Sequence, residues 1–125
     1  MSPEGSDDNP GTKRKPFLTL ERARAEVRKT RSGNKGKPEA VTVWLRKGTY
    51  LIGTTMEFTP EDSGVESAPV TYAAYKGEKV VISGGRSITG WQKGGGELWT
   101  TVVPGVKDGA WYFHQLFVDG NRRTR

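Results

Sequence analysis

Residues 41–91 read VTVWLRKGTYLIGTTMEFTPEDSGVESAPVTYAAYKGEKVVISGGRSITGW and contain most of the strand-forming sequence of the chain. It holds four short apolar runs rich in β-branched and aromatic residues, at Val41–Leu45, Met56–Phe58, Val70–Ala74 and Val80–Ile82. Glycine, proline and serine separate each run from the next, which is typical of short strands divided by turns. The sequence therefore predicts four strands in this stretch.

The spacing of these predicted strands fits two architectures equally well. The offset from Val41 to Val70 is 70 − 41 = 29 residues, and that from Met56 to Val80 is 80 − 56 = 24. Two similar offsets are typical of two coils of a solenoid, whose repeats run to roughly 20–45 residues. A short antiparallel meander would produce nearly the same string, so the pattern alone leaves both architectures open.

Several motifs resemble those of one superfamily, and the resemblance favours the solenoid. The motifs are GTY at 48–50, FTPEDSG at 58–64, APVTY at 68–72 and ISGGR at 82–86, preceded by GSDDNPGT at 5–12 and KPF at 15–17. They resemble the N-terminal coils of right-handed parallel β-helix proteins in the pectate-lyase-like superfamily, and more narrowly its secreted, glycoside-hydrolase-like members. The resemblance implies a mostly β fold, the N-terminal portion of a right-handed parallel β-helix.

The resemblance also implies a division of the chain into residues 1–91, the cap and first coils, and residues 92–125. QKGGGE at 92–97 is interpreted as a flexible break. In the resembling proteins, a Trp-containing strand followed by F-x-Q-L-F-V-x-G starts a β-sandwich-like insertion, and Phe113, Gln115–Val118 and Gly120 match that pattern. His114 departs from it, because arginine is expected there. Asp119-Gly120 predicts a hairpin turn.

A helix is predicted from Leu20 to about Thr30, with Thr19 as its N-cap. Leu20, Ala23 and Val27 form one apolar stripe at helical spacing, while arginines occupy the other faces. A basic recognition helix for nucleic acid and an amphipathic lid would both use such a segment. The stripe favours the lid, and the resembling β-helices have a helix that plugs the open N-terminal end.

Composition limits the classes of partner. The net charge is +6, from 20 basic and 14 acidic residues, which can mark a nucleic-acid partner. The basic residues are spread along the chain with acids among them, so a solvated surface is the favoured interpretation and no nucleic-acid partner is expected. Cysteine is absent, which removes disulfides and thiolate metal sites. No apolar run is long enough to cross a membrane.

Trp44 is the one candidate contact for carbohydrate. Alternation along Val41–Leu45 predicts that Val41, Val43 and Leu45 face the core, while Thr42 and Trp44 face outward. Trp44 is then either an exposed stacking platform for a sugar or a residue buried under a neighbouring loop. Burial under a loop is the more common situation for a tryptophan.

The sequence yields no catalytic, cofactor-binding or metal-binding residue. A glycosidase needs two carboxyl groups that flank the scissile bond; the candidates are Glu57, Glu61, Asp62 and Glu66. Glu61 and Asp62 are adjacent in a Pro/Gly-flanked loop, which favours solvation and turn bonding. Likewise, Asp7, Asp8 and Asn9 are better explained by Asx-turns than by a calcium loop, which needs six to eight oxygens. His114 lacks the partners of a catalytic histidine.

The resemblance therefore supplies the functional hypothesis. It implies the N-terminal part of a secreted carbohydrate-active enzyme, a glycoside hydrolase cleaving plant or microbial polysaccharide, with its catalytic acids on later coils beyond residue 125. MSPEGS at the start has no apolar leader segment, so secretion rests on the resemblance. The alternatives are a polysaccharide lyase, a non-catalytic glycan-binding or adhesion module and, more remotely, a basic nucleic-acid binder. Exposed coil edges also predict self-association of the isolated chain.

Overall fold

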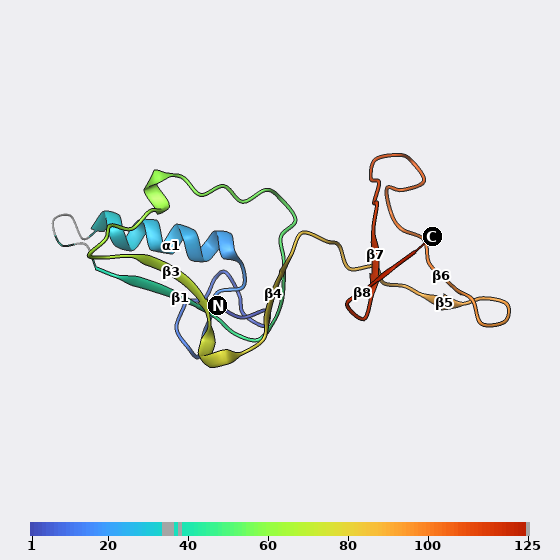
Figure 1. The fold of residues 1–125 in the computed structure, drawn as a ribbon, viewed down its shortest axis with the longest axis horizontal. Coiled ribbons are helices and arrows are strands. Elements are labelled where there is room, and N and C mark those ends of the chain that lie inside the picture. The colour runs from blue at the N-terminus through green and yellow to red at the C-terminus, as the bar shows by residue number, and fades with distance from the viewer. Residues whose placement is uncertain (34–36, 38, 125) are drawn as a thin grey trace. The chain divides into compact units, whose positions relative to one another are not determined.

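The computed structural model describes residues 1–33, 37 and 39–124, and the chain divides into two compact units, Met1–Arg86 and Ser87–Arg125. The predicted boundary lies a few residues later, after Trp91. The structure is mostly β with one helix (Figure 1). No helix among these described residues has the length and apolarity that a bilayer crossing requires.

The first unit contains two parallel strand pairs, so the meander is wrong. Strand β1 (Val41–Leu45) pairs with β3 (Val70–Ala74), with Val41 opposite Val70. Strand β2 (Gly48–Leu51) pairs with β4 (Val80–Ser83), with Gly48 opposite Val80. The offsets are 29 and 32 residues (70 − 41 and 80 − 48). One passage of the chain through two strands therefore lies beside the next passage in the same direction, as consecutive coils would.

The predicted strand at Met56–Phe58 is wrong, because the ladder of β4 is already occupied by Gly48–Leu51. Met56 still packs against the core, whereas Phe58 is exposed and meets the ring of Tyr72 edge-on, with centroids 5.6 Å apart. These contacts explain the apolar run without a strand. The motif GTY at 48–50, which lies outside the four predicted strands, forms most of β2.

The alternation predicted for β1 is confirmed. Leu45 is buried, and Val43 packs against the same core, while Thr42 and Trp44 are exposed. Tyr50 of β2 is also buried, and its hydroxyl donates to the carbonyl of Arg46 at 2.9 Å. Burial raises the pKa of Tyr50, because the charged phenolate would lose its hydration.

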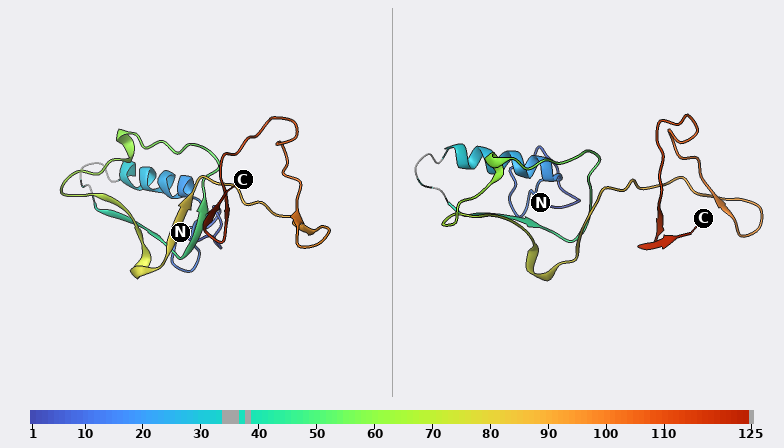
Figure 2. Two further views of the ribbon diagram at one scale, coloured as in Figure 1. Left: turned by 45° about the vertical axis from the view of Figure 1, so that its right-hand side comes forward. Right: turned by 45° about the horizontal axis from the view of Figure 1, so that its top comes forward.

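Helix α1 (Leu20–Gly33) begins as predicted and ends three residues beyond Thr30. The hydroxyl of Thr19 accepts the backbone N–H of Arg22 at 3.1 Å, which is the predicted N-cap. Leu20, Ala23 and Val27 are all buried, which confirms the apolar stripe. In every view α1 runs alongside β1 and β3 (Figures 1 and 2), and Leu20 and Ala23 share the core with residues of β1 and β2.

The N-terminal segment fixes the start of this helix. The carboxylate of Asp7 accepts the N–H of Leu18 at 3.0 Å, the N–H of Thr19 at 2.9 Å and the hydroxyl of Thr19 at 2.7 Å. Burial alone would raise the pKa of Asp7, but these bonds and the charge of Arg22 hold it below its usual value. The Asx-turn predicted for Asp7 is therefore wrong, since its partners lie eleven and twelve residues away.

The second unit consists of two short antiparallel pairs. Strand β5 (Gln92–Lys93) pairs with β6 (Trp99–Thr100), so the predicted break at 92–97 is in part a hairpin. Strand β7 (Leu116–Val118) pairs with β8 (Asn121–Arg123). The turn between them is Asp119-Gly120, with φ of 52° and 75°, which confirms the predicted hairpin. None of the described residues of this unit is buried.

The first prediction concerns the stripe of α1. Val27→Asp should destabilise the first unit by several kcal/mol, because an unpaired carboxylate would replace a side chain that is 4% exposed. Ala25→Asp is the matched control, since Ala25 is an exposed position of the same helix and its change should stay within about 0.5 kcal/mol. Denaturant unfolding measures both free energies. Equal midpoints would show that Val27 does not hold the helix to the strands.

Candidate functional site

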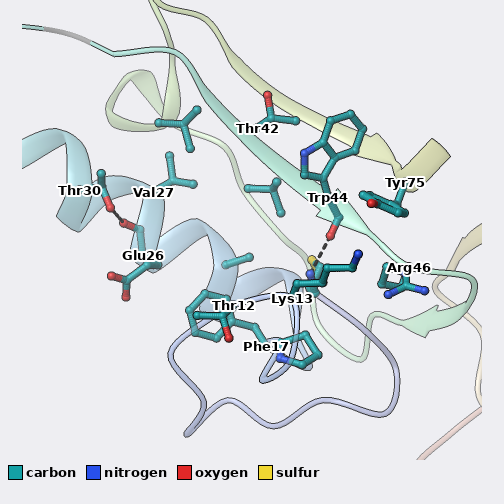
Figure 3. A pocket seen from close by; sticks show the side chains of 16 residues that line it. Thr12, Lys13, Phe17, Glu26, Val27, Thr30, Thr42, Trp44, Arg46 and Tyr75 are labelled. Atoms are coloured by element: carbon teal, nitrogen blue, oxygen red, sulfur yellow. Dashed lines mark hydrogen bonds between the residues drawn. The ribbon is translucent and has the colours of Figure 1, made fainter.

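A pocket of about 420 Å³ lies in the first unit, between α1, β1 and the N-terminal segment (Figure 3). Its lining is mixed in character: apolar side chains come from the helix and the strand, and hydroxyl and charged groups lie around them. The lining residues are Met1, Gly11, Thr12, Lys13, Pro16, Phe17, Ala23, Glu26, Val27, Thr30, Val41, Thr42, Val43, Trp44, Arg46 and Tyr75.

Two aromatic rings stand at one side of this pocket. Trp44 and Tyr75 meet edge to face, with centroids 5.8 Å apart and planes at 89°. They come together because Trp44 projects outward from β1 and Tyr75 directly follows β3, the partner of β1. Trp44 remains 46% exposed, so the interpretation that it is buried under a loop is wrong. Its ring is available to a ligand.

Three cationic groups surround the ring of Tyr75. The nitrogen Nζ of Lys13 lies 5.8 Å from its centroid, that of Lys76 5.5 Å and the carbon Cζ of Arg46 5.2 Å. Such distances allow cation–π attraction. Neither lysine forms an ion pair within the described part of the chain.

Arg46, in contrast, is paired. Its Nε lies 2.9 Å from Oε2 of Glu78, and the backbone N–H of Lys47 donates to the same carboxylate at 2.6 Å. The hydrogen bond from Arg46 is the main reason that the pKa of Glu78 is lowered. This pair ties the end of β1 to the turn before β4 and offsets the charge of Arg46. Lys13 and Lys76 therefore supply the unpaired positive charge beside the aromatic pair.

Asp62, one of the candidate carboxylates, is bound by a basic residue of the helix. Both of its oxygens accept from Arg28 at 2.6 Å, and one also accepts the N–H of Thr59 at 2.8 Å. The predicted turn bonding is confirmed, but the predicted solvation is wrong, since Asp62 is 6% exposed. The Arg28 guanidinium, more than any other group, holds the pKa of Asp62 far below its usual range. Asp62 links α1 to the 3₁₀ turn Pro60–Asp62.

The remaining candidates do not assemble into a site. Glu57, Glu61 and Glu66 are exposed, and Glu61 reaches Arg28 only at 3.3 Å. In the described residues, no cluster of three or more Asp, Glu, His or Cys side chains could hold a metal ion. His114 lies in the second unit, edge-on to Tyr112 at 4.9 Å.

Sequence reasoning missed Lys13, Arg46 and Tyr75 as neighbours of Trp44. Tyr75 could have been found from the register, because Trp44 lies opposite Ala73, two positions before Tyr75. Lys13 could not, since its position depends on the long path of residues 1–17.

No protein-family model matches the chain. The chain is similar to an uncharacterized protein, YwoF, of Bacillus subtilis strain 168, with 42% identity over 84 residues, which is 67% of the chain and 15% of that protein. It is also similar to the pectate lyase PEL9 of Emericella nidulans, with 37% identity over 84 residues, 67% of the chain and 18% of that protein. The chain thus spans less than a fifth of the length of these relatives.

Two solved structures are similar as well. A glycoside hydrolase matches 99% of the chain with a TM-score of 0.85 and 37% identity, over 21% of its own length. A structure of XylC with xylose matches 78% of the chain with a TM-score of 0.52 and 29% identity, over 13% of its own length. The chain is therefore similar to carbohydrate-active proteins of the pectate-lyase and glycoside-hydrolase kinds.

The second prediction concerns the pH dependence that Asp62 adds to stability. A carboxyl whose pKa is lowered by folding stabilises the protein above its unfolded pKa, about 3.9, and this contribution is lost as the pH falls toward the folded pKa. Asp62→Asn should lower the melting temperature at neutral pH and flatten its decline below about pH 4. Glu66→Gln, at an exposed loop position, is the control. Identical pH profiles for Asp62→Asn and the unchanged chain would contradict this role.

Proposed function

We propose that the chain forms the N-terminal cap and first coils of a right-handed parallel β-helix in a secreted glycoside hydrolase that cleaves plant or microbial polysaccharide. The observation that carries the proposal is the pairing of two successive strands with the next two, in parallel and at similar offsets. The similarity to a glycoside hydrolase over 99% of the chain supports it. Helix α1 then lies at the N-terminal end of the coils.

We place the catalytic carboxylates outside residues 1–125. A glycosidase needs one carboxyl as acid and another as base or nucleophile, on either side of the sugar. Asp62 is held by Arg28, and the one acidic residue that lines the pocket, Glu26, pairs with Arg22 at 2.8 Å. These carboxylates serve the packing of α1. The chain's part in the enzyme is then to close the coils and to hold substrate.

Trp44 is the residue we assign to that contact. Its exposed indole packs at 89° against the ring of Tyr75 and presents a flat apolar surface to the apolar face of a sugar ring. The hydroxyls of Thr12 and Thr42 and the ammonium of Lys13 lie around the same pocket and could bond sugar hydroxyls. Such a mixture of an apolar surface and a few polar groups is typical of ligand sites.

A polysaccharide lyase is the second candidate, because the pectate lyase of Emericella nidulans is 37% identical over the matched residues. A lyase leaves an unsaturated sugar at the cleaved end, whereas a hydrolase does not. Product analysis of the longer protein therefore separates the two reactions.

The third prediction tests the function. Incubated with xylan, pectin and fucosylated substrates, the chain alone should release no product at any pH, while its tryptophan fluorescence should change on addition of oligosaccharides. Trp44→Ala should weaken this binding about tenfold or more, which corresponds to roughly 1.4 kcal/mol, whereas Trp91→Ala, in the second unit, should not.

Three outcomes would contradict parts of this proposal. Turnover by the chain that disappears in Glu61→Gln or Asp62→Asn would place the catalytic groups within it. Glycan binding with no turnover by the longer protein would favour an adhesion module. Binding to nucleic acid that falls steeply with salt would favour a basic nucleic-acid protein.

The fourth prediction is that the isolated chain self-associates. In the described structure β3 and β4 each have one paired neighbour, and Val81 and Ile82 of β4 are 42% and 53% exposed. Exposed strand edges pair with other strands, and the repulsion of the +6 charge is screened beyond roughly 8 Å at physiological salt. Ile82→Lys should weaken association, and Thr55→Lys, which adds the same charge in an exposed loop, should not. Sedimentation over a range of concentrations measures it, and a monomer throughout would contradict it.

A further inference from the structure

The edge of β1 that faces α1 is incompletely paired. The N–H of Val41 donates to the carbonyl of Pro69, so the backbone groups of residues 41, 43 and 45 face β3. Those of Thr42, Trp44 and Arg46 point the opposite way, and all three residues line the pocket. Within the described residues, the N–H and C=O of Thr42 and the N–H of Trp44 have no hydrogen-bond partner.

Met1 already occupies one position of a strand on this edge. Its nitrogen donates to the carbonyl of Trp44 at 2.6 Å, and its carbonyl accepts the N–H of Arg46 at 3.0 Å. A residue that bonds the carbonyl before and the N–H after a given position is paired in parallel with it, here with Leu45. Chain continuing from the nitrogen of Met1 would therefore run along β1 past Trp44, Val43 and Thr42.

The open backbone groups fit that path at strand spacing. In a residue two positions N-terminal to Met1, the backbone carbonyl would accept the N–H of Trp44 and the backbone N–H would donate to the carbonyl of Thr42. A residue four positions ahead would accept the N–H of Thr42. Four added residues would therefore pair all three open backbone groups. A ligand that lacks the regular spacing of backbone groups in a β-strand would not pair with all three.

The side chains around this edge determine which positions of such a segment would be apolar and which polar. Met1 is 8% exposed and faces the core beside Leu45, so the residues two and four positions ahead of it would face the same way, opposite Val43 and Val41. Phe17 of the N-terminal segment and Val27 of α1 line that side of the pocket. Apolar side chains fit these two positions, and polar ones fit the alternate positions.

The state of the amino group is consistent with this arrangement. Burial, and next the charge of Arg46, lower the pKa of the Met1 ammonium. An amide N–H at the same place would make the same bond to Trp44 without a desolvated charge.

We propose that this groove is the docking site of an extended polypeptide segment that runs parallel to β1, joined to the nitrogen of Met1, with apolar side chains opposite Val41 and Val43. The proposal does not depend on the carbohydrate function, because a segment in this groove leaves the outward, exposed side of Trp44 for a sugar. A separate peptide or a second copy of the chain would have to bring its own end against Met1, which already occupies the edge. A segment joined to Met1 continues the existing ladder without a gap.

The fifth prediction tests this site with N-terminal extensions. Three chains are compared: one beginning at Met1, one with Val-Thr-Val-Thr joined ahead of Met1, and one with Thr-Val-Thr-Val. The two extensions have the same composition, but a shift of one residue turns every apolar side chain to the other face. Val-Thr-Val-Thr should raise the melting temperature and slow amide exchange at Thr42 and Trp44 about tenfold or more. Thr-Val-Thr-Val should do so much less.

Exchange at the amide of Ala73 in β3, which the ladder pairs with the carbonyl of Val43, serves as the control for general stabilisation. The ratio of the Thr42 exchange rate to the Ala73 exchange rate is the deciding quantity. Equal effects of the two extensions, or no selective protection of Thr42 and Trp44, would overturn the proposal. A free acetylated Val-Thr-Val-Thr amide, added to the chain that begins at Met1, should give no protection at millimolar concentration. Protection equal to that from the joined extension would assign the groove to a separate molecule and overturn the covalent arrangement.

Discussion

The parallel ladder between β1 and β3 is the constraint on which the rest of the first unit depends. A parallel pair cannot be closed by a tight turn, so the chain must leave β1, form β2 and cross back before β3 begins. That path brings β4 onto β2 and forms a core that includes Leu45 and Tyr50. It also leaves β1 with a second edge, and α1, Met1 and the pocket all lie along that edge.

Two ion pairs hold this arrangement from outside the core. Arg28 joins α1 to Asp62, in the crossing between β2 and β3, and Arg46 joins the end of β1 to Glu78. Each carboxylate also accepts a backbone N–H, from Thr59 and Lys47 respectively. Charge-assisted bonds of this kind fix loops that have few apolar contacts of their own. They explain why acidic residues in FTPEDSG and at Glu78 serve the fold, although their residue type alone would also suit catalysis.

Local patterns in the sequence predicted the parts of this structure that local physics controls. The helix, its Thr19 cap, its buried stripe, the faces of β1 and the Asp119-Gly120 turn depend on residues close in the chain. The errors concern long-range partners. Asp7 was expected to bond its own turn and instead bonds Thr19, and Met56–Phe58 was expected to pair with β4, which pairs with Gly48–Leu51. For the site, Trp44 was identified from its outward position, but Tyr75 and Lys13 required the register and the path of the N-terminal segment.

The two edges of the paired strands differ in what covers them, and this difference has a physical cause. The β1 edge faces α1, whose buried stripe and Thr19 cap are fixed by the sequence next to it, so a local element can shield it. Among the described residues of the first unit, no such element covers the outer edge of β3 and β4, and Val81 and Ile82 of β4 are exposed there. Strands that follow in parallel are the cover that matches a parallel edge, because they continue its hydrogen bonds and bury the same side chains. A helix would bury the side chains but leave the backbone groups unpaired, as the open groups of Thr42 and Trp44 beside α1 illustrate.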